Sequence, residues 1–115
     1  MKATTIPLRR LAGFALPAIA LSLSGAASPG AAPNEYTITM ANMSFGKIPT
    51  GVKVGDAITW VNKDSVVHSA TARDHSFDVR TNPGQKVRMV VKKAGSFPFY
   101  CIFHSMMRAT LVVTN

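Results

Sequence analysis

The sequence has a single cysteine, Cys101, among its 115 residues. One cysteine excludes a disulfide within the chain, so this frequent support of small exported domains is absent. A free thiol outside the cytoplasm is also open to oxidation or to pairing with another chain. So small a domain has a thin core and often needs extra support. A bound metal ion remains a possible support, and it would also occupy the thiol.

Long hydrophobic runs are lacking as well. The apolar stretch near the N-terminus covers 11–23 and contains Gly13 and Pro17, whereas a membrane-spanning helix needs about 20 apolar residues. No cysteine directly follows this stretch, which leaves bacterial lipid attachment without support. We therefore expect no stable membrane insertion.

The N-terminus instead has the pattern of a secretory signal. Lys2, Arg9 and Arg10 form a basic start, the apolar stretch comes next, and small residues over 24–27 offer a cleavage site. The Arg9-Arg10 pair also agrees loosely with a twin-arginine signal, so the general secretory and twin-arginine routes are both open. Either route predicts a periplasmic protein.

These features divide the chain into three segments. We predict a cleaved signal peptide over 1–26, a flexible leader over 27–34 and a single domain over 35–115. Acidic residues are few, five against 13 Lys and Arg, and loss of the signal leaves a net charge of about +5. Without a dense basic run, nucleic-acid binding is not expected. The charge suits an anionic partner, and simple solubility explains it equally well.

From residue 35 onward the pattern is that of β-strands, with few helical signals. Short runs of β-branched, aromatic or alternating residues are separated by turn residues every 8 to 12 positions or so. Seven or eight short strands with this spacing predict an all-β sandwich or Greek-key barrel. The predicted strands cover 36–40, 52–54, 57–61, 66–72, 77–79, 85–91, 97–101 and 109–113.

Three residues with metal-binding side chains lie close together near the C-terminus. Cys101, His104 and Met107 have the spacing C-x2-H-x2-M. On a straight strand these offsets would place the side chains on opposite faces, and on a helix the first and third would diverge. A tight loop can direct all three at one ion, and we expect it between a strand that ends at Cys101 and one that begins near Ala109.

The donor types favour copper. Thiolate and thioether sulfurs suit Cu(I), and imidazole suits both Cu(I) and Cu(II). A second histidine would complete a plane of two histidines and one cysteine with a weak axial methionine, as in blue-copper electron-transfer sites. His68, on a separate predicted strand, is the best candidate. A lone cysteine in a small β domain is more often a buried core residue than a metal ligand. Zinc is the alternative metal, but structural zinc sites rarely use methionine as a ligand.

Residues 36–113 resemble the cupredoxins, the small type 1 copper proteins of the plastocyanin-azurin family. The resemblance is carried by VKVGDAITWVNKDSVVHSATARDHSFD, by PGQKVRMVVKKAGSFPFYC and by CIFHSMM, whose ligand spacing is similar to that of amicyanin-like members. It implies a Greek-key β-sandwich that binds one copper ion per chain. It also implies His68, Cys101, His104 and Met107 as the ligands.

The ligand segment departs from these relatives in three ways. Amicyanin-like loops usually carry proline beside the second histidine, and CIFHSMM has none. Met106 stands next to Met107 and could compete as axial ligand; the family spacing favours Met107, with Met106 at the surface. Many relatives have asparagine after the first histidine, where it donates a hydrogen bond to the thiolate and joins two loops, and here the residue is Ser69.

The resemblance implies a one-electron carrier rather than an enzyme. We expect a monomer that shuttles electrons between redox proteins. The amicyanin-like resemblance suggests a dehydrogenase as donor and a c-type cytochrome as acceptor, and a shuttle in denitrification or general respiration is equally open. His104 would be the exit, ringed by Ile102, Phe103 and Met106. A copper carrier with an exposed site is the alternative. An enzyme with Cys101 as nucleophile ranks below both, because the chain has no Gly-rich oxyanion loop.

Overall fold

The computed structural model describes Gly13 and residues 32–115. The predicted signal peptide, apart from Gly13, and residues 27–31 of the predicted leader lie outside the described residues. The described part contains β-strands and no helix, and so no helix there could cross a membrane. In chain order the strands are β1 (Glu35–Ala41), β2 (Ser44–Phe45), β3 (Val52–Lys53), β4 (Ala57–Asn62), β5 (His68–Ala72), β6 (Asp78–Thr81), β7 (Lys86–Val90), β8 (Gly95–Cys101) and β9 (His104–Thr114).

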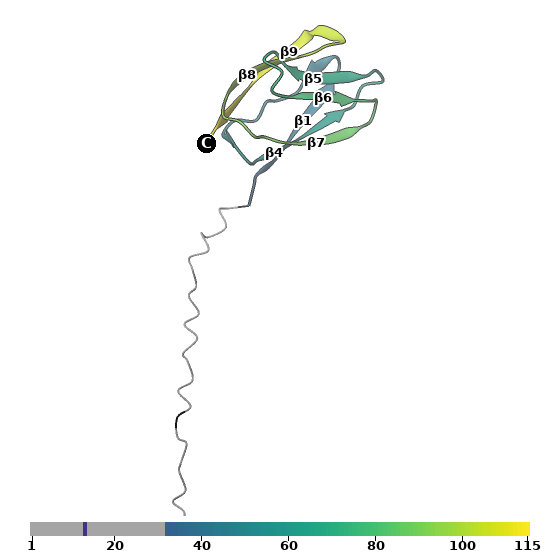
Figure 1. Ribbon diagram of the computed structural model, residues 1–115. Coiled ribbons are helices and arrows are strands. Elements are labelled where there is room, and N and C mark those ends of the chain that lie inside the picture. Colours follow the sequence, from purple (N-terminus) through teal and green to yellow (C-terminus); the bar gives the residue numbers. More distant parts are fainter. Residues whose placement is uncertain (1–12, 14–31) are drawn as a thin grey trace, which may run out of the picture. The chain divides into compact units, whose positions relative to one another are not determined.

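The strands form two sheets that enclose one core (Figure 1). One sheet has the order β2-β1-β4-β7 and the other the order β3-β9-β8-β5-β6. The pairs β1–β4 and β3–β9 are parallel, and the remaining pairs are antiparallel. This architecture confirms the predicted all-β sandwich.

The strand boundaries agree with the prediction to within two residues except near the metal-binding motif. Each of the eight predicted strands has a counterpart, and β2 was missed because two residues give no periodic pattern. The last strand was predicted to begin near Ala109, and it begins at His104. That boundary was wrong because the strand continues through the motif and pairs His104 with Cys101.

An aromatic cluster fills the core beneath the motif. The ring centroid of Phe99 lies 4.8 Å from that of Phe45, 5.4 Å from that of Trp60 and 5.8 Å from that of Phe77. The alternation of side chains along β8 buries Phe97, Phe99 and Cys101 on the same face. The thiol is therefore the last member of a row of core side chains.

Trp60 lies in this cluster with its polar group unpaired. Its side chain is buried, and Nε1 has no hydrogen-bond partner among the described residues. A buried N–H without a partner loses its hydration and gains nothing in return, which costs about 1–3 kcal/mol. The value of Trp60 to the fold is therefore the apolar area of its rings.

The two largest aromatic residues of the core should thus respond differently to truncation. Phe99→Ala should lower the free energy of unfolding by about 3–5 kcal/mol, because it opens a cavity at the centre of the cluster. Trp60→Phe should cost less than about 2 kcal/mol, because removal of the unpaired N–H offsets part of the lost packing. Urea unfolding of both variants measures the difference, and equal losses would contradict this account of Trp60.

Candidate metal centre

A shift of register in the β8–β9 hairpin brings the motif together. From Gly95 to Tyr100 the two strands pair regularly, and Tyr100 lies opposite Arg108. Continued regularly, Cys101 would face Met107, but its partner is His104 and the intervening residues of β9 bulge. Such a bulge re-aims side chains locally. His104, which alternation alone would separate from Met107, therefore pairs with Cys101, and Met107 lies in the same core cluster as Cys101.

The thiol of Cys101 is buried and faces two nitrogen atoms. The backbone N–H of Ser69 donates a hydrogen bond to Sγ over 3.3 Å. Nδ1 of His68 lies 3.9 Å from Sγ, and both side chains are fully buried. A buried sulfur that accepts an N–H and faces an imidazole nitrogen suits a thiolate that shares a metal ion with that imidazole.

Ser69 also joins the two loops that supply these groups. Its Oγ accepts a hydrogen bond of 2.9 Å from the backbone N–H of Ile102, and it lies 3.0 Å from Oγ1 of Thr71. Thr71 donates its single hydroxyl proton to Asp78 over 2.7 Å, so Ser69 is the donor to Thr71. The serine hydroxyl thus links β5 to the turn after Cys101, and the backbone N–H of the same residue bonds the sulfur.

His68 is held by a residue that the sequence did not point out. Nε2 of His68 lies 2.7 Å from Oδ2 of Asp64. The same carboxylate accepts the backbone N–H groups of Asn42, over 2.7 Å, and of Met43, over 2.9 Å. Because a carboxylate fixes the proton on the ring nitrogen that it bonds, Nδ1 is left with its lone pair free and directed at the thiol side.

Asp64 lies between the strands predicted over 57–61 and 66–72, and the sequence indicated no role for it beyond that of a turn residue. Its pKa is lowered chiefly by the backbone N–H of Met43 and next by the imidazole of His68, so the carboxylate is ionised at neutral pH. The signal that could have identified it is its position four residues before His68. That spacing allows a contact with His68 only when the turn folds back toward β5.

The two adjacent methionines have opposite environments. The side chain of Met107 is 2% exposed, and that of Met106 is 93% exposed. Both lie on β9, where successive side chains point to opposite faces. Met107 is therefore the thioether available inside the protein, and Met106 lies at the surface.

His104 is the least enclosed of the four predicted ligands. It is half-buried, and its ring centroid lies 5.2 Å from that of His68. Within Gly13 and residues 32–115, no three histidine, cysteine, aspartate or glutamate side chains converge as a complete metal site. In the described structure His68 therefore lies next to Cys101, and His104 lies beside this pair. The three side chains do not converge on one position that could hold a metal ion. The four-residue ligand set remains a prediction.

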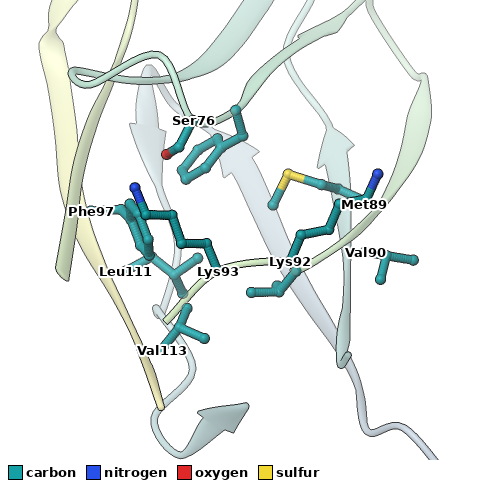
Figure 2. Close-up of a pocket in the computed structure, with 10 residues that line it drawn as sticks. Ser76, Met89, Val90, Lys92, Lys93, Phe97, Leu111 and Val113 are labelled. Atoms are coloured by element: carbon teal, nitrogen blue, oxygen red, sulfur yellow. The ribbon is translucent and has the colours of Figure 1, made fainter. Parts of the chain in front are cut away.

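A separate hollow between the sheets lies away from these residues. It has a volume of about 200 Å³, and Figure 2 shows Met89, Phe97, Leu111 and Val113 around it. The residues that line it include two lysines but no histidine or cysteine. It therefore offers no donor set comparable to that at the end of β8.

The chain belongs to a known family. Residues 13–113 match the family described as the cupredoxin-like domain. The chain is also similar to amicyanin from Paracoccus denitrificans, with 26% identity over 88 residues that cover 71% of this chain and 67% of that protein.

Solved structures of amicyanin variants have the same fold. One, in the reduced state, is 26% identical, has a TM-score of 0.59 and covers 69% of this chain and 81% of its own. A second, a Cu(I) form, is 25% identical, has a TM-score of 0.60 and covers 71% and 84% of the two chains. These likenesses confirm the resemblance to cupredoxins that the sequence indicated.

The contacts of Asp64 predict a strong effect on metal binding. Asp64→Ala should weaken the affinity for Cu(II) by about 10–100-fold, the usual effect of losing a partner of a metal-bound histidine. Competition with a chelator of known affinity measures this change. Asp74→Ala is the matched control, because Asp74 also accepts a backbone N–H, that of Ser76, but does so in a different turn. Equal effects of both variants would refute the role of Asp64.

Proposed function

We propose that this protein is a one-electron carrier with a type 1 copper site whose ligands are His68, Cys101, His104 and Met107. The observation that carries the proposal is the buried Cys101 sulfur, which accepts the N–H of Ser69 and faces Nδ1 of His68. The N–H donor holds the sulfur and the imidazole nitrogen faces it, which places two donor atoms where one metal ion could bind both. Membership of the cupredoxin-like family supports the same assignment.

Each side chain in this proposal has a distinct task. Copper supplies the chemistry, because it takes up and gives back one electron by changing between Cu(II) and Cu(I). His68 and Cys101 are fully buried and are held by Asp64 and Ser69, so they keep their positions in both states. Met107 would supply a buried thioether as the fourth donor. A site whose ligands move little between the Cu(II) and Cu(I) forms needs little structural rearrangement when the electron is transferred.

The protein surface above the site supports brief contact with redox partners. Ile102 is 37% exposed, Phe103 43% and Met106 93%, and all three lie within two residues of the half-buried His104. A small apolar area of this kind suits weak, transient docking, which belongs to the smallest class of interfaces. His104 is therefore the proposed exit for the electron.

Arginine side chains flank this apolar area on one side. The Arg80 guanidinium lies 5.6 Å from the ring centroid of Phe103, and that of Arg73 lies 4.5 Å from the ring of Tyr100. Arg108 is exposed on β9 opposite Tyr100. Three exposed cations beside the exit favour an acidic partner and accelerate its approach at low ionic strength.

The remaining parts of the proposal concern the setting of the protein. The basic start and apolar stretch of the sequence support export to the periplasm. The likeness to amicyanin supports a dehydrogenase as electron donor and a c-type cytochrome as acceptor, with the carrier acting as a monomer. A periplasmic copper carrier is the alternative, and the visible spectrum separates the two.

Spectroscopy of the mature chain tests the copper assignment. With Cu(II) bound, we expect an intense blue or green thiolate-to-copper band and the matching EPR signal, because Cys101 is the only thiol. Cys101→Ser should abolish the band, whereas Ser105→Ala, a change at an exposed residue of the same hairpin, should leave it intact. A protein that holds Cu(I) tightly but never shows the band would be a carrier, and one without tight copper would overturn the proposal altogether.

The arginine flank predicts a salt-dependent reaction rate. In stopped-flow oxidation of the reduced protein by hexacyanoferrate(III), a trianion, the rate should fall as ionic strength rises. The double variant Arg80→Gln/Arg108→Gln should react about two- to fivefold more slowly at low salt. Lys53→Gln is a control for the loss of one positive charge far from the proposed exit. Lys53 is exposed, and its backbone lies opposite Thr114 at the other end of β9. A reaction rate that does not change with ionic strength would exclude electrostatic steering by these arginines.

A further inference from the structure

A methionine-lined hollow lies beside the proposed copper site. It has a volume of about 260 Å³ and is lined by Met43, His104, Ser105, Met106 and Met107. Three of these side chains carry thioethers and one an imidazole, which are the uncharged donors that suit Cu(I). The hollow reaches from surface methionines to two of the proposed ligands, His104 and Met107.

Two of the methionines are more exposed than packing would require. Met106 is 93% exposed and Met43 is 44% exposed, whereas Met40 and Met107 are almost fully buried. Met43 lies in the turn between β1 and β2, and Met106 lies in the bulge of β9. The hollow therefore presents thioethers from two separate elements to solvent at one place.

The backbone of Met43 is strained, which indicates that its side chain has a use. Asn42 has a φ of 53° and Met43 a φ of 59°, both in the left-handed region. A two-residue turn of this kind prefers Asn followed by Gly, because glycine adopts positive φ without steric cost. Here methionine stands where glycine would be favoured, and the Asp64 carboxylate holds its N–H in place. Strain that is kept at a site is a reason to look for a function there.

We propose that Met43 and Met106 form an acquisition site for Cu(I), from which the ion passes to Met107, His104 and the buried Cys101. This inference rests on the copper site proposed above. The passage is an exchange of ligands: thioether–copper bonds break as bonds to the buried donors form, and the Cys101 thiol releases its proton to solvent. Copper remains Cu(I) throughout, so the step needs no oxidant or reductant.

An alternative use of the same side chains is apolar docking alone. Leucine would serve that purpose equally well, because it has a similar size and no sulfur. Replacing methionine by leucine therefore separates the two uses. Because Met43 and Met106 are exposed, these changes should leave the core and the buried ligands in place.

The first experiment looks for the site directly in the copper-loaded protein. Cu(I) is added without oxygen to protein that already holds one Cu(I), and the methyl groups of its methionines are followed by NMR after 13C labelling. We expect the signals of Met43 and Met106 to shift, while those of Met40 and Met89, which do not line this hollow, stay unchanged. Unchanged signals for Met43 and Met106 would overturn the proposed site.

The second experiment measures transfer into the buried centre. The rate at which the metal-free protein takes up Cu(I) from a chelator should fall about tenfold or more in Met43→Leu/Met106→Leu, because thioethers bind this ion and leucine does not. The visible band of the double variant loaded with Cu(II) should equal that of the wild type. Met89→Leu is the matched control and should load normally. Loading of the double variant at the wild-type rate would refute the acquisition role.

Met43→Gly gives a further distinguishing result. The change should keep or raise the melting temperature, because glycine relieves the positive φ, and yet it should slow Cu(I) loading. A purely structural role for Met43 predicts no change in loading. The two proposals fail in different ways. If the copper-site proposal is wrong, the wild-type protein loaded with Cu(II) lacks the visible band. If only the acquisition-site proposal is wrong, the band is present and the methionine substitutions leave the rate of Cu(I) loading unchanged.

Discussion

The metal-binding end of this protein depends on one carboxylate. Asp64 accepts hydrogen bonds from the backbone of Asn42 and Met43 in the first sheet and from the imidazole of His68 in the second. The two sheets are therefore joined at this end by directional, charge-assisted contacts, in addition to the hydrogen bond of 3.0 Å that Asn62 of β4 donates to the carbonyl of Thr81 of β6. The orientation of His68, the shape of the β1–β2 turn and the position of Met43 all follow from this carboxylate.

The second constraint is the bulge in β9. A regular hairpin would place only one of His104 and Met107 on the same face as Cys101. The register shift after Tyr100 pairs His104 with Cys101 and leaves Met107 in the core cluster that contains Cys101, while the rest of β9 keeps its pairing with β8. The aromatic cluster around Phe99 fixes the same strand from below, so the position of the sulfur is set by the core rather than by a mobile loop.

Much of this arrangement could be predicted from the sequence, because it depends on local periodicity. The alternation of Phe97, Phe99 and Cys101 indicates a strand that ends with an inward thiol, and turn residues mark most strand ends. The bulge could not be predicted in this way, since alternation assumes an unbroken register. For the same reason the start of β9 was misplaced, and the two methionines could be assigned only by family spacing.

The contacts of Asp64 were beyond sequence reasoning for a different reason. Residue 68 is only four positions from residue 64, but residues 42 and 43 approach residue 64 only after β1 has paired with β4. A carboxylate in a polar turn has many ordinary uses, and the position of Asp64 four residues before His68 does not by itself distinguish it. Long-range hydrogen bonds of this kind can be recognised only when the partner backbone groups have been placed.

The same rigidity has a consequence for how metal could reach the site. Cys101 and His68 are fully buried, and their partners hold them so firmly that the pair offers little freedom to capture an ion from solvent. Tight, buried coordination favours retention, whereas capture requires exposed donors that bind weakly and exchange quickly. Met43 and Met106 have those properties, and the turn that holds Met43 is fixed by the same Asp64 that orients His68. One carboxylate thus positions a buried ligand and an exposed donor at the two ends of a single short path.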